Sequence, residues 1–361
     1  ICMTFDPWGA GKITDYEHAF KKFGLEKFDK AKFPIDHYLF RRNLIIAHRD
    51  FGKYYDRIKS KKTFLQLTGI ASSGDLHFGH KVDIDLFRVF KDLGAKGYFC
   101  VCDLDAYTSR SDKKIPDLKT AKEYAVKNTA HLLAFGFTSK DIYVQSRKGS
   151  RYYEFVFEIS KKITSNMFEA VYGHKDLGKV SAVLLQLADI IHVQLPEFFG
   201  KNPSLTGIGL DQDPHAKITR DVVKRLPYDL ELPSFLYFLH QSGLKEGSKM
   251  SSSEPATAIF LEDSPEVVKK KINRTFTGGR DSVNEQRDKG GNPDICKVYE
   301  FFKFHHPEDL FMVDLGKECR SGKILCGECK GNCVKFINDF LEGHQRKYKK
   351  ALPEAKKIVY G

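Results

Sequence analysis

The segment from Thr68 to His80, TGIASSGDLHFGH, constrains the fold more than any other part of the sequence. It follows the short apolar run Phe64 to Thr68, which predicts a strand. After it, apolar residues recur at helical spacing from Val82 to Phe90, and Gly94 is suited to cap the end of that helix. Strand, glycine-rich turn and helix in this order predict the first unit of a parallel α/β sheet.

Three further short apolar runs predict strands of the same sheet, with longer helical segments between them. They are Tyr98 to Cys102, Ile142 to Gln145 and Leu205 to Leu210. Because parallel strands need long crossover connections, this alternation favours a sheet with helices on its faces.

The chain divides into three predicted parts. Residues 1–60 are expected to form an N-terminal extension with helical stretches such as Tyr38 to His48. Residues 61–245 hold the predicted sheet. From there to residue 361 the chain is more helical and more charged, with basic runs at Lys269 to Lys271 and Lys347 to Lys350, which predicts a second, largely helical domain.

The glycine-rich turn has the composition of a phosphate site. Gly69, Gly74 and Gly79 allow a ligand to approach the backbone, and the amides at the start of the helix favour an anion. His77 and His80 are three residues apart and can donate hydrogen bonds to phosphate oxygens, most strongly when protonated. The alternative is a tight turn that carries two surface histidines.

A second polar segment, GSKMSSSEPATAIFL from Gly247 to Leu261, stands before an apolar run. Lys249 offers a mobile positive charge, and Met250 precedes three serines whose hydroxyls and amides suit a pyrophosphate leaving group. These serines are Ser251, Ser252 and Ser253. The alternative is a flexible serine-rich loop with an incidental lysine.

Taken together, HFGH and KMSSS resemble the two signatures of the class I aminoacyl-tRNA synthetases, in the same order and about 170 residues apart. The resemblance implies a Rossmann-type catalytic domain and a helical anticodon-binding domain in residues 246–361, with a dimerisation insert within residues 61–245. It also implies ATP with Mg²⁺, and catalysis by positioning and charge stabilisation. The sequence departs from relatives at Ser72, where they have proline.

Within this class the chain is most similar to the tryptophanyl-tRNA synthetases, especially those of archaea. The segment GIGLDQDPHAKITRDV, Gly207 to Val222, resembles their ATP-contacting turn at Gly209, Asp211 and Gln212. DPWG near the start and the TGGR and EQR segments at 277–287 extend the resemblance. The rival is the tyrosyl family, which shares both signatures and phrases such as CDLDAYTSR. Independently of the family, Asp211 and its neighbour Asp213 suit helix N-termini.

The segment LLQLADIIH, Leu184 to His192, is an apolar helix with two polar residues on one side, Gln186 and Asp189. A carboxylate is an acceptor suited to the indole N–H, which is only a donor. By resemblance, Asp189 would bind that group and Gln186 the amino group of tryptophan, while Asp105 and Tyr107 would line the pocket. Asp189 is otherwise a buried structural carboxylate.

Four cysteines have the spacing C-x22-C-x6-C-x2-C, and converging thiolates suit zinc or an iron–sulfur cluster. They are Cys296, Cys319, Cys326 and Cys329, with Cys333 as a further candidate. The same spacing is found in tryptophanyl-tRNA synthetases that carry a 4Fe-4S cluster, so the resemblance implies this cluster near the anticodon. Zinc and no metal remain the alternatives. Cys100 and Cys102 are expected to be ordinary buried thiols.

The formal net charge of +12 and the pI near 9.1 are compatible with a polyanionic partner. No apolar stretch approaches the roughly 20 residues that a membrane-spanning helix needs, and we expect neither a secretory signal nor membrane association. We therefore expect a cytoplasmic protein. The resemblance implies a homodimer that binds L-tryptophan and tRNA. An inert RNA-binding paralogue is the alternative, against which the two intact signatures argue.

Overall fold

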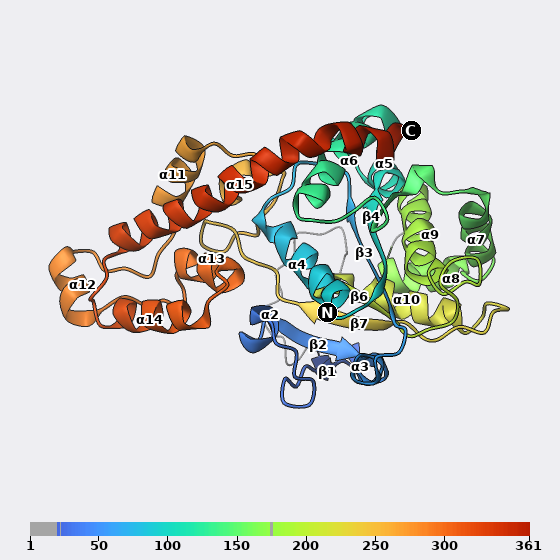
Figure 1. Cartoon of the computed structure of the whole chain (residues 1–361), viewed down its shortest axis with the longest axis horizontal. Coiled ribbons are helices and arrows are strands. Elements are labelled where there is room, and N and C mark those ends of the chain that lie inside the picture. The colour runs from blue at the N-terminus through green and yellow to red at the C-terminus, as the bar shows by residue number, and fades with distance from the viewer. Residues whose placement is uncertain (1–19, 22, 174–175) are drawn as a thin grey trace.

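A seven-stranded sheet forms the centre of the molecule in the computed structural model, which describes residues 20–361 except 22, 174 and 175 (Figure 1). The strands are β1 (Glu26–Lys27), β2 (Ile45–Arg49), β3 (Leu65–Ala71), β4 (Lys96–Cys102), β5 (Ile142–Val144), β6 (Ser204–Gly209) and β7 (Ser234–Phe238). Their order is β1-β2-β7-β6-β3-β4-β5. Strands β3 to β7 are mutually parallel, while β1 and β2 are antiparallel additions at one edge. The predicted α/β class is confirmed.

The four predicted strands correspond to β3, β4, β5 and β6, but the helical prediction for Tyr38 to His48 is wrong. Only Tyr38–Arg41 is helical (α2), and β2 follows it. Asn43 adopts a positive φ of 54°, which breaks the helix, and the β-branched Ile45 and Ile46 then favour an extended backbone. Part of residues 1–60 thus belongs to the sheet.

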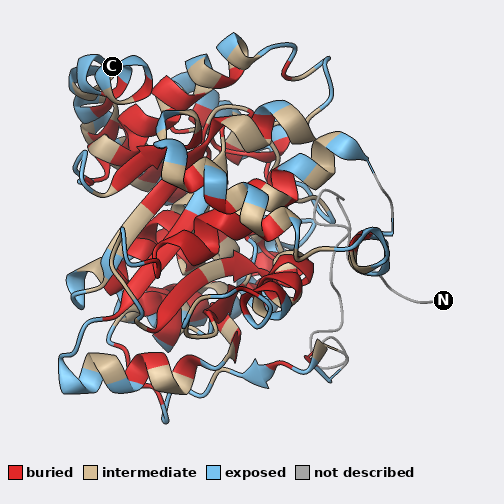
Figure 2. Ribbon diagram, turned by 90° about the vertical axis from the view of Figure 1, so that its right-hand side faces the viewer, coloured by how far each residue is buried: buried red, intermediate tan, exposed pale blue. Residues whose placement is uncertain are grey.

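Helices cover both faces of the sheet. The helices up to β7 are α3 (Phe51–Ser60), α4 (Phe78–Asp92), α5 (Asp103–Ser109), α6 (Leu118–Ala134), α7 (Ser150–Ser160), α8 (Ser165–Tyr172), α9 (Leu177–His192) and α10 (Asp213–Val223). Helices α4 and α6 share a core with β4 on one face, and α9 and α10 pack against the other. Buried residues concentrate around the sheet between these layers (Figure 2). The helix expected after the glycine-rich turn is α4, and Gly94 follows it with φ 100°.

Beyond β7 the described chain is helical, as predicted. It contains α11 (Pro265–Asn273), α12 (Val283–Lys289), α13 (Lys297–His305), α14 (Asp309–Arg320) and α15 (Cys326–Tyr360). The 35-residue α15 runs back over the sheet layer and packs along α6 (Figure 1). His344 there lies 2.9 Å from His131 of α6, between their ring nitrogens, and Tyr348 stacks on the same ring.

Membrane-crossing segments are absent from the part of the chain that the structure describes, since none of its helices combines the necessary length and apolarity. The tryptophan Trp8 and the DPWG segment lie outside the described residues.

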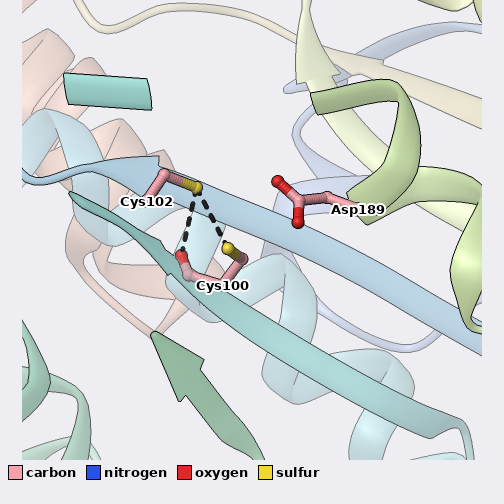
Figure 3. A group of neighbouring side chains, drawn as sticks. All are labelled: Cys100, Cys102 and Asp189. Carbon is pink, nitrogen blue, oxygen red and sulfur yellow. Dashed lines mark hydrogen bonds between the residues drawn. The ribbon is translucent and has the colours of Figure 1, made fainter. Parts of the chain in front are cut away.

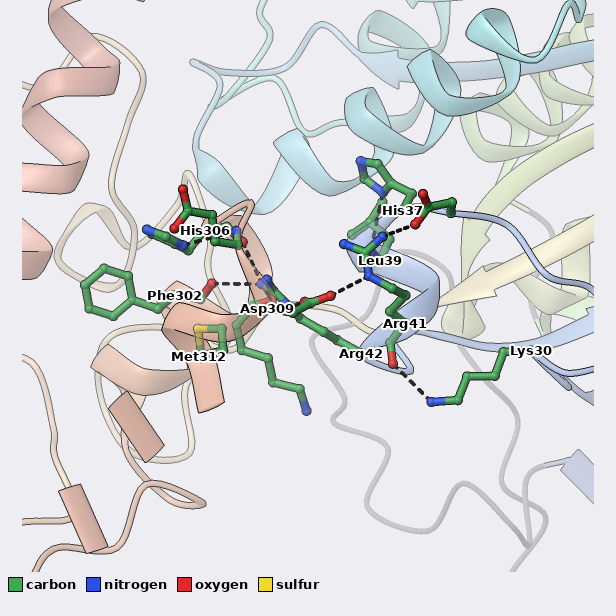
Figure 4. Close-up of polar contacts among 12 residues, drawn as sticks. Lys30, His37, Leu39, Arg41, Arg42, Phe302, His306, Asp309 and Met312 are labelled. Carbon is green, nitrogen blue, oxygen red and sulfur yellow. Dashed lines mark hydrogen bonds and ion pairs between the residues drawn. The ribbon is translucent and has the colours of Figure 1, made fainter. Parts of the chain in front are cut away.

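Two arginines at the end of α2 join the sheet layer to the helical part: Arg41 is its last residue, and Arg42 is its C-cap (Figure 4). Both Arg41 and Arg42 pair with Asp309 at the start of α14. The Arg42 side chain is only 8% exposed, and its Nη1 also donates to the carbonyl oxygens of Lys303 (3.1 Å) and His306 (2.7 Å). It therefore binds carbonyls at the C-terminal end of α13, where the helix leaves them without partners.

We expect Arg42→Met to lower the free energy of unfolding by about 2–3 kcal/mol, because it leaves carbonyls at a half-buried joint without a charged donor. Arg41→Met is the matched control. Arg41 is 43% exposed and pairs with carboxylates near solvent, so its loss should cost less than about 1 kcal/mol. Urea unfolding followed by circular dichroism measures both, and equal losses would contradict the assignment.

Candidate functional site

The two signature segments are hydrogen-bonded to each other. The Phe78 amide donates to the carbonyl oxygen of Ile259 at 3.0 Å, and the Leu261 amide donates to that of Leu76 at 2.9 Å. His77 and Phe260 form the bridge between these bonds. The structure thus brings HFGH and KMSSS together at the carboxyl end of β3, where open parallel sheets bind their ligands.

Two glycines of the turn lie directly beneath the KMSSS loop. A Cβ atom on Gly74 would lie 3.1 Å from Ser252 Oγ, and one on Gly79 would lie 2.9 Å from the His77 ring and 3.5 Å from Met250 Cβ. Side chains at these positions would push the loops apart, so glycine is required by close approach. In the loop itself, the Ser253 amide donates to Ser251 Oγ at 3.2 Å.

His77 and His80 stack at the start of α4, with ring centroids 3.9 Å apart. His77 Nδ1 accepts the Gly79 amide, and His80 Nδ1 accepts the His77 amide, both at 3.1 Å. Burial lowers the pKa of His77 well below its usual range and that of His80 to about 4. Both are therefore neutral near pH 7 with the proton on Nε2. The alternative of two surface histidines is therefore wrong for His77, which is buried. Neither histidine is the protonated donor that would bind phosphate most strongly.

Asp211 is the carboxylate of the predicted ATP-contacting turn, Gly209 to Gln212, which has the sequence GLDQ and is called the GxDQ turn below. Its Oδ1 lies 2.7 Å from His240 Nε2, its Oδ2 accepts from Gln212 Nε2 at 3.2 Å, and Lys249 Nζ lies 3.6 Å away. Burial alone would raise the pKa of Asp211, but the hydrogen bond and charge of His240 and the charge of Lys249 hold it far below its usual range. An ionised Asp211 thus connects the GxDQ turn with the KMSSS loop.

His240 is a residue of this site that was not predicted from the sequence. It follows β7 by two residues and packs on the GxDQ turn so tightly that a Cβ atom on Gly209 would lie 2.0 Å from its Nε2. The available signal was its position just beyond a buried apolar run, because that run is a parallel strand whose carboxyl end faces the ligand edge.

An open cleft of about 900 Å³ adjoins the two signature loops, at the upper end of the usual range for ligand pockets. The glycine-rich turn contributes Ser73 and Gly74, and the KMSSS loop contributes Ser252 and Ser253. Three lysines also line the cleft, Lys113, Lys114 and Lys271. Hydroxyls, turn amides and ammonium groups in one cleft suit a polyphosphate or a nucleic-acid end.

Asp189 of α9 is buried in a hydrogen-bond network that the sequence did not reveal. Its Oδ1 accepts from the hydroxyls of Tyr143 and Tyr152, each at 2.6 Å. Its Oδ2 accepts from Gln145 Nε2 at 2.6 Å. Burial raises the pKa of Asp189 to about 6, a rise that these donors limit. No short motif links the donors, which come from β5, the turn after it and α7.

Cys100 and Cys102 of β4 point toward Asp189 across the gap between the sheet and α9 (Figure 3). The three groups lie within 4.8 Å of one another, and the two sulfurs are 3.2 Å apart. Burial raises the pKa of Cys100 to about 12, so it is a protonated thiol, and both Asp189 oxygens already accept hydrogen bonds. The predicted buried thiols are thus a wall of the Asp189 site, and this chemistry disfavours a metal there.

The other pocket candidates are less closely associated with Asp189. Gln186 lies one turn earlier on α9 and is half-buried. Asp105 is in the first turn of α5, where its amide donates to Gln145 Oε1 at 2.9 Å, so it joins the same network. Tyr107 is 44% exposed and lines none of the described pockets.

The four predicted cysteine ligands surround one enclosed cavity in the helical part. Cys296, Cys319, Cys326 and Cys329 all line it, together with mainly apolar side chains. Cys333 is fully buried on α15 but does not line it. Burial raises the pKa of Cys329 to about 12, with the other three cysteines adding to the rise. A cationic centre would reverse this, because it stabilises thiolates.

The spacing of these four sulfurs distinguishes between metals. Four thiolates around one zinc ion, each about 2.3 Å from it, lie about 3.8 Å apart. Among the described residues, no three of these cysteines have sulfurs within 4.8 Å of one another. A cluster of four irons holds its cysteine sulfurs farther apart than one ion does, and the described sulfurs are more widely spaced than a single zinc ion requires.

Comparisons with known proteins agree with this site. The family model of the class I tRNA synthetases (W and Y) matches residues 59–342. The chain is 37% identical to the tryptophan–tRNA ligase of Aeropyrum pernix over 98% of this chain and 97% of that protein. It is 35% identical to that of Methanocaldococcus jannaschii over 99% of each. The crystal structure of tryptophanyl-tRNA synthetase from A. pernix has a TM-score of 0.88, and the match covers 98% of both chains at 37% identity.

The tautomer and pKa of His80 can be tested by nitrogen NMR on histidine-labelled protein. We expect its ring to titrate near pH 4 and to carry its proton on Nε2 at neutral pH. Because the folded-state pKa lies below the ordinary value of 6.5, this group's contribution to stability is lost as the pH falls from 6.5 toward 4. His80→Gln assigns the signal. A ring that titrates near 6.5 would contradict the assignment.

Proposed function

Because the chain belongs to the class I tRNA synthetases that serve tryptophan and tyrosine, we propose that its two signature loops hold ATP while tryptophan is activated. Its function is that of a tryptophan–tRNA ligase. The enzyme joins L-tryptophan to ATP with release of pyrophosphate, and then transfers the tryptophanyl group to the 3′ end of its tRNA.

The backbone pairing of residues 76–78 with residues 259–261, which holds the two signature segments together, carries the proposal. The neutral rings of His77 and His80 offer Nε2–H donors to phosphate oxygens, and the amides of the turn at Gly74 and Gly79 offer further ones. Gly69 and the GxDQ residues Gly209, Asp211 and Gln212 border the nucleotide. Mg²⁺ would bind together with ATP and would supply positive charge to its phosphates.

In the activation step, a tryptophan carboxylate oxygen attacks the α-phosphorus, and the bond from that phosphorus to the bridging oxygen breaks. The charge on the departing pyrophosphate then rises, and Lys249 moves from Asp211 to neutralise it. Met250 and the serines Ser251, Ser252 and Ser253 cover the leaving group. In the second step the tRNA hydroxyl attacks the carbonyl carbon, and AMP leaves. No enzyme nucleophile is needed.

Asp189 is the proposed acceptor for the indole N–H. A carboxylate has about four acceptor positions, and its three protein donors leave one on Oδ2. Tyr143 and Tyr152 fix the carboxylate, so the remaining position has a defined direction. Gln186, half-buried one turn away, is the proposed partner of the substrate's amino group. Asp105 and Tyr107 are proposed to border the pocket.

The proposed resident cofactor is a 4Fe-4S cluster held by Cys296, Cys319, Cys326 and Cys329, with zinc as the weaker alternative. An enclosed, mainly apolar cavity and sulfurs too dispersed for one ion support the cluster. It would act as a structural crosslink between the start of α13, α14 and α15, close to exposed lysines such as Lys335 that suit the tRNA anticodon. A homodimer and a cytoplasmic location are proposed from the family alone.

Exchange of labelled pyrophosphate into ATP tests the activity and the amino acid together. We expect exchange with tryptophan and none above background with tyrosine. Lys249→Ala should lower the exchange rate about 100-fold, because one charge on the leaving group is removed, while the KM for tryptophan changes little.

Lys245→Ala is the matched control, because Lys245 is an exposed lysine of the same loop without a role in the proposed site. Exchange with tyrosine alone would refute the choice of tryptophan. Exchange with neither amino acid would favour the inert RNA-binding paralogue.

The cofactor proposal predicts a brown protein after anaerobic purification, with absorption at about 400 nm and four irons and four sulfides per chain. Cys326→Ser should abolish the colour, whereas Cys333→Ser should leave it, because Cys333 does not line the cavity. A colourless protein with one zinc per chain would refute the cluster.

A further inference from the structure

Gln286 is a polar side chain enclosed in the cysteine-lined cavity. It belongs to α12, which begins at Val283, and it is only 4% exposed. It lines the cavity together with the four cysteines, where the other side chains are mostly apolar. The lining side chains include Val298, Leu315, Ile324 and Leu325. A buried amide in such surroundings requires partners for its hydrogen-bonding groups.

One half of the amide is satisfied and the other is not. Gln286 Oε1 accepts the backbone amide of Arg280 at 2.9 Å. This bond fixes the orientation of the amide, because a flipped side chain would place its NH₂ against another donor. Gln286 Nε2 is fully buried and has no hydrogen-bond partner among the described residues. An unpaired buried donor has lost its hydrogen bond to water without replacement, so its presence requires an explanation.

The free Nε2 lies on the side of the cysteines. A Cβ atom built on Gly291 would lie 2.8 Å from Gln286 Nε2 and 3.0 Å from Cys319 Sγ, so both atoms border the same small space. A Cβ atom on Gly279 would lie 2.6 Å from Cys326 Sγ and 3.5 Å from Gln286 Oε1. The two glycines thus let the backbone and this amide approach the sulfurs, where a larger side chain would intervene.

The remaining contacts of α12 hold the amide in place. Arg287 Nη1 donates to the carbonyl oxygen of Gly322 at 3.0 Å, and a Cβ atom on Gly322 would lie 2.3 Å from the Gln286 carbonyl oxygen. Arg280 Nε donates to the carbonyl oxygen of Gly290 at 2.9 Å. Helix α12 is therefore closely fitted to the loop that follows Cys319.

We propose that Gln286 is a positioning residue of the cysteine centre, whose Nε2–H donates a hydrogen bond to a sulfur of the cluster beside Cys319. This inference rests on the proposed 4Fe-4S cluster. Electron-rich sulfur is the acceptor that the buried N–H otherwise lacks. The bond stabilises the more negative, reduced state most, so it raises the reduction potential, since hydrogen bonds to sulfur are among the factors that set this potential.

The test compares Gln286→Glu and Gln286→Met with wild type, all isolated anaerobically. Glu keeps an acceptor for the Arg280 amide but lacks the N–H donor, and Met removes both functions at similar size. Asn284→Asp is the matched control, because it makes the same amide-to-acid change two residues away on the exposed side of α12. Iron and sulfide content, visible absorption and a redox titration followed by electron paramagnetic resonance are measured for each.

We expect both Gln286 variants to be harder to reduce. At the wild-type midpoint, the ratio of reduced to oxidised cluster should fall about tenfold, which corresponds to about 59 mV for a one-electron couple. Asn284→Asp should keep the wild-type potential. If Gln286→Glu fails to fold, Gln286→Met decides the test. If Gln286→Met fails to fold, Gln286→Glu decides it.

Two negative results have different meanings. A wild-type protein that binds no iron after anaerobic reconstitution overturns both the cluster and the role of Gln286. Variants that hold iron at the wild-type level with an unchanged potential overturn the role of Gln286 alone, as does a shift of equal size in Asn284→Asp.

Discussion

The backbone pairing of residues 76–78 with residues 259–261 is the interaction on which the proposed ATP site depends. It connects the end of β3 to a segment far away in the sequence that leads into the helical part. Because backbone hydrogen bonds fix both register and direction, the pairing determines which serine faces Gly74 and where Lys249 begins relative to Asp211. The KMSSS loop adds bonds of its own, because the Glu254 amide donates to the carbonyl oxygen of Ser251 at 3.1 Å and Lys249 is bridged to Ser242.

Local patterns were sufficient to predict much of the fold. The unit from β3 to α4 combines an apolar run, glycines at close approaches and helical periodicity, and each of these acts over a few residues. Tyr38 to His48 was misjudged because its aromatic and basic residues suit either structure, and the left-handed Asn43 that ends α2 gives little signal in sequence. Strand β7 was not predicted, although Ser234 to Phe238 is a short apolar run that is fully buried.

The sequence predicted which residues form the candidate site better than it predicted their protonation states and hydrogen bonds. Spacing alone grouped the four cysteines, and the structure brings them around one cavity. The neutral state of His80 depends on burial and on which ring nitrogen accepts a backbone amide, which is a tertiary property. The hydrogen bonds to Asp189 and the contact between His240 and Asp211 likewise join separate elements. They therefore cannot be predicted from periodicity in the sequence.

Helix α15 has fixed contacts at two distant points, with Cys329 at the cysteine cavity and His344 against α6. A helix advances about 1.5 Å and turns about 100° for each residue. Deleting one residue between these points would therefore rotate His344 away from His131 or carry Cys329 out of its cavity. The length of this stretch of α15 thus sets both the distance and the relative rotation between the cysteine cavity and the sheet layer.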